Sequence, residues 1–159
     1  MENNSIINLE LMRYSNKKYK DIWDAIRDSS SVLIKNNYIT NKWLEKLKSL
    51  TDNYGYYFIL TDDMVFPHIS PGSETIKDCV AFSILKYPVN IDHKNHKTRK
   101  IKFILTLVSI TGDGHMDILQ KIIQLWNDHL WLNLIGNINS QKEMIKIERY
   151  LNKLKGIGE

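Results

Sequence analysis

His68 is the first residue whose type and position suit chemistry, because it lies in the stretch FPHISPG between an apolar run and a turn. Pro67 fixes its own backbone angle and has no N–H, so it suits the end of a strand. Pro71 and Gly72 then turn the chain. A histidine at such a junction presents a ring nitrogen at the rim of a sheet. From this context alone, a displayed reactive histidine and an ordinary solvated loop histidine remain equally open.

His115 is the second candidate. It follows the sequence TGDG and leads a segment with helical spacing of apolar residues, so it lies in the first turn of a predicted helix. Backbone N–H groups and the helix dipole favour an anion at that position. Asp113 is an alternative N-cap, and it would make His115 an incidental first-turn residue. Taken alone, His115 is better explained in this second way.

The two histidines together indicate more than either does alone. If the strand predicted at residues 101–110 lies beside the strand ending at Phe66, the loop after it brings His115 close to His68. A neutral imidazole is a nucleophile near neutral pH, because its ordinary pKa is about 6.5. A second imidazole and the N–H groups of a helix start would stabilise a phosphoryl group bound to the first. The pair therefore indicates reversible phosphoryl transfer through a phosphohistidine.

The remaining candidates carry weaker signals. His93 and His96 form an H-x-x-H pair, but two ligands do not make a metal site and the neighbouring basic side chains repel a cation. We interpret that stretch as a solvated connection. Cys79, the single cysteine, begins an apolar run and is expected to be a small buried side chain. His129 carries no signal. Because no phosphate-binding loop or dinucleotide glycine pattern occurs, we expect no cofactor.

Helical spacing of apolar residues predicts four helices around a strand-rich middle. They cover residues 22–36, 40–55, 115–136 and 140–154. The last begins with Ser140 and has Glu143 three places later, which is a capping box.

Short runs rich in β-branched and aromatic residues predict four strands. They cover residues 56–60, 64–66, 79–85 and 101–110. The last run is apolar almost throughout, which is typical of a central strand covered on both faces. Strands flanked by helices indicate an α/β protein, a three-layer α/β/α sandwich. Residues 1–20 are polar and weakly patterned, so we expect an N-terminal arm or short helix before one domain at residues 21–155.

The composition excludes several classes of protein. With 43% hydrophobic and 25% charged residues, the 159-residue chain is expected to form one globular domain. The formal charge of +4 is spread along the chain, with its densest cluster at residues 93–100. Without a binding motif or interleaved aromatic residues, this charge does not predict a nucleic-acid partner. No leader-like or membrane-spanning stretch is found, so we expect a cytoplasmic protein.

Residues 53–91, NYGYYFILTDDMVFPHISPGSETIKDCVAFSILKYPVNI, resemble the phosphoacceptor region of enzyme IIA (EIIA) proteins of the mannitol/fructose type in the sugar phosphotransferase system. The pattern is nearest to the ascorbate-type branch, in which G-P-Y-I-V-I precedes A-P-G-I-A-L-P-H-A-R-P. The later stretch IKFILTLVSITGDGHMDILQKI resembles that family's strand, short loop and H-L-x-x-L helix. The resemblance covers residues 22–150 with the elements in the same order.

The resemblance implies a fold, a reaction and its partners. The fold would be a mixed central β-sheet flanked by helices, with no metal and no nucleotide. His68 would be the phosphoacceptor, as a tele-phosphohistidine, and His115 the second active-site histidine. The carrier protein HPr would donate to His68, and an EIIB protein or domain would accept the group for sugar arriving through an EIIC permease. The alternative is a stand-alone regulatory EIIA-like protein whose phosphorylation controls a partner protein.

Ser70 is where this chain departs from its resemblance. The ascorbate-type pattern reads P-H-A-R-P, whereas this chain reads P-H-I-S-P, so a serine replaces an arginine beside the expected acceptor. The hydroxyls of Ser70 and Ser73, or local backbone N–H groups, are candidate hydrogen-bond donors to a phosphoryl group. The branch makes ascorbate a hypothesis for the transported sugar.

Overall fold

A four-stranded mixed sheet forms the middle of the molecule in the computed structural model, which describes residues 7–92 and 98–153 except for the side chains of residues 113–115. The strands are β1 (Met12–Ser15), β2 (Met64–Val65), β3 (Cys79–Ile91) and β4 (Arg99–Val108), in the spatial order β1-β3-β4-β2. β3 and β4 are antiparallel, whereas β1 runs parallel to β3 and β2 parallel to β4. The mixed sheet is therefore confirmed.

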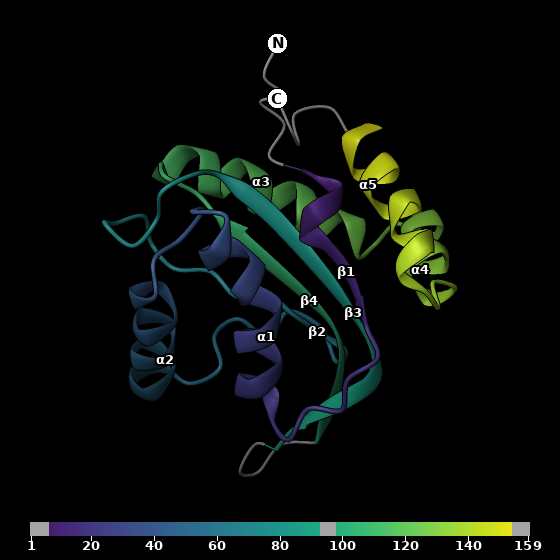
Figure 1. The fold of residues 1–159 in the computed structure, drawn as a ribbon, viewed down its shortest axis with the longest axis horizontal. Helices are drawn as coiled ribbons and strands as arrows, with labels where there is room; N and C mark the ends of the chain where they lie inside the picture. The colour runs from purple at the N-terminus through teal and green to yellow at the C-terminus, as the bar shows by residue number, and fades with distance from the viewer. Residues whose placement is uncertain (1–6, 93–97, 154–159) are drawn as a thin grey trace.

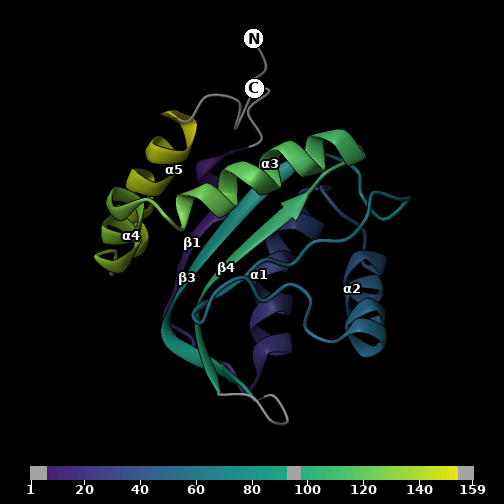
Figure 2. The same cartoon turned by 180° about the vertical axis from the view of Figure 1, so that it is seen from behind.

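Helices cover both faces of this sheet. The described residues form α1 (Ile22–Lys35), α2 (Lys42–Tyr54), α3 (Gly112–Leu125), α4 (His129–Gly136) and α5 (Met144–Lys153), with two 3₁₀ turns, η1 (Leu9–Leu11) and η2 (Gln141–Glu143). Figures 1 and 2, seen from opposite sides, show α1 and α2 on one face and α3 on the other. α4 and α5 pack together, and α5 contacts β1. The predicted three-layer α/β/α sandwich is confirmed.

The core lies on both faces of the two long strands. Residues 103–108 of β4 are all buried, as expected for a central strand. Phe82 of β3 stacks on Phe103 with ring centroids 6.0 Å apart, and Trp131 of α4 packs 5.6 Å from Phe82. Burying each phenylalanine contributes roughly 1.5–3 kcal/mol to folding. The contact between Phe82 and Trp131 therefore packs α4 against the sheet.

The strand predicted at residues 56–60 is wrong. Gly55 ends α2 with a φ of 78°, and the chain then turns instead of extending. Tyr56 and Tyr57 pack edge-on against Phe58, with ring centroids 5.8 Å and 5.5 Å away. Phe58 is 1% exposed. The aromatic residues that suggested a strand form a cluster around one buried ring.

The described part of the first twenty residues contains the short 3₁₀ turn η1 and then the strand β1, which sequence analysis did not predict. β1 pairs with β3 from Met12 opposite Phe82 to Ser15 opposite Leu85. The side chain of Gln141 then completes the open edge of β1, because its amide donates to the Met12 carbonyl oxygen at 2.8 Å and accepts from Tyr14 N–H at 2.7 Å. This segment is therefore part of the domain.

The helix predicted at residues 115–136 is divided into α3 and α4. Asp128 begins the second helix, since its carboxylate accepts from the N–H of Leu130 at 2.9 Å. The capping box at the last helix is altered: the Glu143 carboxylate accepts from Asn139 N–H and from the Ser140 hydroxyl, each at 3.2 Å. The spacing of apolar residues therefore did not distinguish the two helices, and Asp128 is the residue that marks the start of the second one.

The register of β2 and β4 decides which loops meet. Met64 lies opposite Phe103 and Val65 opposite Ile104 in a parallel pair. Parallel strands end at the same edge of a sheet, so the loop after β2 and the loop between β4 and α3 leave from one side. This is the arrangement on which the pairing of the two predicted histidines depends.

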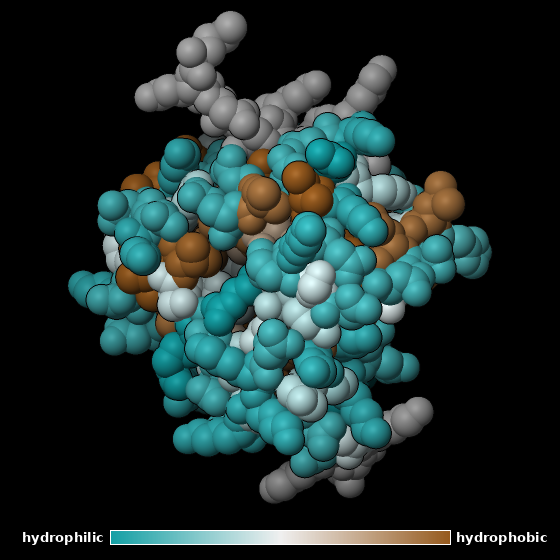
Figure 3. All heavy atoms as spheres, turned by 45° about the vertical axis from the view of Figure 1, so that its right-hand side comes forward, coloured by the Kyte–Doolittle hydropathy of each residue, from teal (hydrophilic) through white to brown (hydrophobic). Residues whose placement is uncertain are grey.

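The surface seen from the side of α4 and α5 is mostly hydrophilic, with apolar side chains gathered in a few groups in the upper half (Figure 3). Leu130 of α4 is 73% exposed, and Ile123 of α3 is 41% exposed. Single exposed apolar side chains are ordinary on folded proteins. Exposure alone therefore does not mark a functional site on this protein.

Candidate functional site

His68 is half-buried in the loop that follows β2. Its ring Nδ1 lies 2.6 Å from the carbonyl oxygen of Phe66. A carbonyl oxygen can only accept a hydrogen bond, so Nδ1 carries the hydrogen in the neutral ring. The lone pair of the neutral imidazole is then on Nε2. In this tautomer Nε2 is the nucleophilic atom of the ring.

Three hydrogen bonds hold the backbone around this ring. The N–H of Phe66 donates to Phe58 O at 2.6 Å, and the N–H of Leu107 in β4 donates to Pro67 O at 3.2 Å. The hydroxyl of Tyr57 donates to the carbonyl oxygen of His68 at 2.5 Å. The loop is thus tied to β4 on one side and to residues 57–58 on the other.

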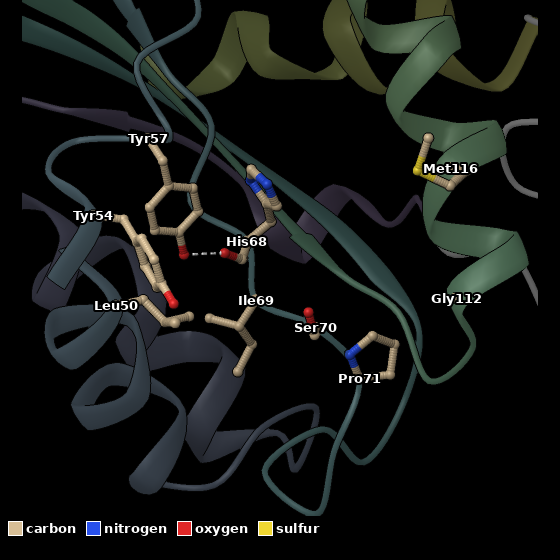
Figure 4. A pocket seen from close by; sticks show the side chains of 9 residues that line it. All are labelled: Leu50, Tyr54, Tyr57, His68, Ile69, Ser70, Pro71, Gly112 and Met116. Atoms are coloured by element: carbon tan, nitrogen blue, oxygen red, sulfur yellow. Dashed lines mark hydrogen bonds between the residues drawn. The ribbon is translucent and has the colours of Figure 1, made fainter.

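A hollow of about 530 Å³ opens beside His68 (Figure 4). Leu50 and Tyr54 of α2 line it from one side, and Gly112 and Met116 of α3 line it from the other. Tyr54 is 75% exposed and Met116 is 53% exposed. No charged side chain lines the hollow among the described residues. Over its described lining, the site is therefore a mainly apolar depression with the His68 imidazole in its wall.

The backbone of His115 lies in the first turns of α3, between Gly112 and Met116, which both line the hollow. Its side chain is outside the described part of the structure. The register of β2 and β4 thus brings the start of α3 to the His68 hollow. The role of the His115 imidazole stays a prediction.

Ser70 and Ser73 lie in different places. Ser70 lines the His68 hollow, whereas Ser73 lines a separate depression beside Lys42 at the start of α2. The reason is a turn, in which Thr75 N–H donates to Gly72 O at 3.1 Å and redirects the chain. Of the two serines, Ser70 is the one that shares a hollow with His68.

Tyr57 is the residue that sequence reasoning missed. Its ring lies edge-on to the His68 imidazole, with centroids 5.3 Å apart and planes at 84°. Burial raises the pKa of its phenol to about 12. The signal for it was the run of aromatic residues before the proline-histidine pair, which was interpreted as a strand.

Two of the weaker candidates, Cys79 and His129, do not line the hollow. Cys79 is buried, and burial raises the pKa of its thiol well above the usual range, which fits a small core side chain. His129 is exposed at the start of α4. His93 and His96 lie outside the described residues. Among residues 7–92 and 98–153, no cluster of three or more metal-ligating side chains occurs, and every helix is too short or too polar to span a bilayer.

Comparison with protein families decides the class of this chain. Residues 5–149 match the family described as "Phosphoenolpyruvate-dependent sugar phosphotransferase system, EIIA 2". The chain belongs to this EIIA family. Among its relatives, the mannitol-specific cryptic phosphotransferase enzyme IIA component of Escherichia coli K12 is 26% identical over 128 residues, which are 80% of this chain and 85% of the relative. The ascorbate-specific EIIA component of Shigella boydii is 18% identical over 125 residues, 78% and 80% of the two chains.

Solved EIIA structures share the fold. The solution structure of the E. coli mannitol-specific cryptic enzyme IIA aligns with a TM-score of 0.74 at 23% identity, covering 90% of this chain and 94% of that one. A complex of E. coli mannitol enzyme IIA with phosphorylated enzyme IIB aligns with a TM-score of 0.70 at 13% identity, covering 90% and 96%. At these identities the likeness establishes the fold.

Proposed function

We propose that this chain is a cytoplasmic phosphocarrier, the EIIA component of a phosphoenolpyruvate-dependent sugar phosphotransferase system. It accepts a phosphoryl group on Nε2 of His68 and passes it to an EIIB protein or domain. The observation that carries the proposal is the hydrogen bond from His68 Nδ1 to Phe66 O, since it leaves the lone pair of the neutral ring on Nε2. Family membership over residues 5–149 supports the class of reaction.

The transfer exchanges one N–P bond for another. The Nε2 lone pair of His68 attacks the phosphorus of the phosphohistidine on HPr. As the new bond forms, the donor's N–P bond breaks and its electron pair returns to the donor's ring nitrogen. The His68 ring gains positive character in this step, and its Nδ1–H, held at 2.6 Å from the Phe66 carbonyl oxygen, stabilises that charge. In the second transfer a nucleophile of EIIB attacks the phosphorus, the His68 Nε2–P bond breaks, and its electron pair returns to Nε2 as the lone pair of the neutral ring.

The surroundings of His68 fit a protein partner. Tyr54 and Met116, 75% and 53% exposed, stand on opposite sides of the hollow. Aromatic and methionine side chains are enriched in the buried centres of protein interfaces. The E. coli mannitol enzyme IIA that shares this fold was solved with phosphorylated enzyme IIB. We infer the same kind of EIIB partner for this chain, with HPr as donor and an EIIC permease further along.

His115 and Ser70 complete the proposed site. N–H groups in the first turn of α3, which begins at Gly112 beside the hollow, favour an anion. We assign the His115 imidazole to stabilise the phosphoryl group there, and the Ser70 hydroxyl to donate a hydrogen bond in place of the family arginine. The higher identity to a mannitol-specific relative than to an ascorbate-specific one leaves mannitol and ascorbate as hypotheses for the sugar.

Phosphorylation in a reconstituted system tests the proposal. The protein is incubated with enzyme I, HPr and labelled phosphoenolpyruvate, and the acid-labile protein label is measured. We expect stoichiometric labelling of the wild type and none of His68→Ala. The matched control is His129→Ala, because His129 is exposed on α4 and lines no part of the hollow. Undiminished labelling of His68→Ala would overturn the assignment.

His115→Ala separates the two histidines. This variant keeps the nucleophile, so we expect full labelling at equilibrium but transfer slowed by about 10²-fold, a usual effect of losing one stabilising donor. Rapid-quench kinetics measure the rate. A rate equal to that of the wild type would remove His115 from the site.

A further inference from the structure

Tyr57 contacts His68 in two ways that the proposed transfer does not use. Its hydroxyl donates to the carbonyl oxygen of His68 at 2.5 Å, and its ring lies edge-on to the imidazole at 5.3 Å (Figure 4). The hydrogen bond fixes the main chain at His68, and the ring contact limits where the imidazole can turn. Both contacts act on His68, and the orientation of its ring determines whether Nε2 can reach a phosphoryl group.

The hydrogen bond from Tyr57 to the His68 carbonyl supports a second hydrogen bond, the one from His68 Nδ1 to Phe66 O. His68 Nδ1 reaches the carbonyl oxygen of Phe66, two residues earlier, so this bond closes only for one arrangement of the backbone between them. Phe66 itself is held by its N–H to Phe58 O at 2.6 Å. Residues 57 and 58 therefore hold both ends of the short segment that carries the imidazole. Losing one end would let the Nδ1 hydrogen bond open.

The Tyr57 phenol suits the role of a permanent hydrogen-bond donor to the His68 main chain, and it does not suit proton transfer. Burial raises the pKa of Tyr57 to about 12, so the hydroxyl stays protonated and donates throughout the working pH range. Its partner is a backbone carbonyl, which cannot take up the proton. Tyr57 is 36% exposed at the edge of the hollow, packed on Phe58 with ring centroids 5.5 Å apart. It is a fixed donor and not a proton carrier.

We propose that Tyr57 is a positioning residue: its hydroxyl bond to the His68 main chain holds the imidazole in the Nδ1–H tautomer, with Nε2 presented for phosphoryl transfer. This inference rests on the proposed function for its consequence, a faster transfer. Its structural content, the tautomer of His68, is independent of that function.

Two variants of tyrosine test the inference. Tyr57→Phe keeps the ring and removes the hydroxyl. Tyr87→Phe is the matched control, because Tyr87 of β3 is 37% exposed, lines no part of the hollow, and has its ring near Lys18 and Lys86. Long-range ¹H–¹⁵N spectra of the unphosphorylated proteins report which ring nitrogen of His68 carries the hydrogen. Single-turnover phosphorylation by phospho-HPr reports the rate.

We expect Tyr57→Phe to give a mixture of His68 tautomers and a transfer rate about tenfold lower, with Tyr87→Phe unchanged in both. A wild-type tautomer and a wild-type rate in Tyr57→Phe would overturn the inference and leave the proposed function intact. If the wild type takes no label, the proposed function fails, and the spectra still decide whether Tyr57 sets the tautomer. Thermal unfolding of each variant separates loss of positioning from loss of fold.

Discussion

His68 and Asp28 are both held by short hydrogen bonds, but the two surroundings treat charge in opposite ways. Asp28 on α1 accepts from the Tyr19 hydroxyl at 2.5 Å and pairs with Arg13 at 2.9 Å and Lys17 at 3.5 Å. Around His68, the bonds run to backbone carbonyl oxygens and the hollow has no charged side chain among its described lining residues.

This difference shows where a new charge can be accommodated. The charge of the Asp28 carboxylate is already balanced by Arg13 and Lys17, so this region stabilises the fold and leaves no unpaired charge on Asp28 for a ligand. The His68 hollow instead offers an imidazole with defined ring direction and the start of α3, with no side-chain charge from its described lining to oppose an incoming phosphoryl group. The cationic residues that give the chain its net charge therefore need not surround its site.

Among the variants that compare these two regions, the largest effect is expected from placing a charge in the hollow. Ser70→Asp puts a carboxylate in the hollow of His68, and repulsion between charges several ångströms apart costs about 2 kcal/mol at an effective dielectric constant near 20. We expect phosphoryl transfer to slow about 30-fold in rapid-quench kinetics. Ser73→Asp is the control, since Ser73 lines another depression. Equal slowing by both variants would contradict the assignment of the hollow.

A smaller effect is expected from the Asp28 network. Asp28→Asn removes a charge that Tyr19 and Arg13 contact, and because Asp28 is partly exposed we expect a loss of about 1 kcal/mol in the free energy of unfolding. Urea unfolding measures it. Transfer from phospho-HPr should keep its wild-type rate, and a slowed rate would show that the two regions are coupled.

The pH dependence of stability follows from the same residue. Burial raises the pKa of Asp28, but the Tyr19 hydrogen bond and the charges of Arg13 and Lys17 outweigh it and lower the pKa below the usual value. A lowered folded pKa gives stability that is complete above the ordinary value of about 3.9 and is lost as the pH falls through the folded value. Unfolding free energies of wild type and Asp28→Asn should converge below pH 4. Parallel curves across that range would show that the Asp28 charge does not stabilise the fold.

The smallest effect is expected at Lys17. Its ammonium lies 3.5 Å from Asp28 and its side chain is 64% exposed, so solvent screens the pair. Lys17→Ala should change the free energy of unfolding by less than about 0.5 kcal/mol, measured by urea unfolding at low and high salt. A loss as large as that of Asp28→Asn would mean that the ion pair, and not the Tyr19 and Arg13 contacts, holds the network.

The sequence predicted the elements whose pattern is local and strong. The continuous apolar run at residues 101–110 became the central strand β4, and the proline before His68 follows the end of β2. The parallel neighbours β2 and β4 are what a shared site at residues 68 and 115 required. The central strand and the strand end before His68 follow from burial and backbone restriction, which short stretches of sequence encode, whereas the pairing of β2 with β4 was only a condition of the prediction.

Other features depend on contacts distant in sequence. β1 was missed because its four residues include Arg13 and its edge is completed by Gln141, 127 residues from Tyr14. Tyr57 was assigned to a strand because aromatic residues favour sheets, whereas burial of Phe58 and the φ of 78° at Gly55 turn the chain there. The hydrogen bond from the Tyr57 hydroxyl to the His68 carbonyl depends on that turn, so no local sequence pattern predicts it.

The position of the phosphoryl group on the protein tests the central claim most directly. The ¹⁵N-histidine-labelled protein is phosphorylated by HPr, and long-range ¹H–¹⁵N and ³¹P-coupled spectra identify the modified nitrogen. The hydrogen bond from Nδ1 to Phe66 O predicts a single phosphohistidine at Nε2 of His68, with Nδ1 still protonated. A phosphoryl group on Nδ1 of His68, or on any other residue, would contradict it.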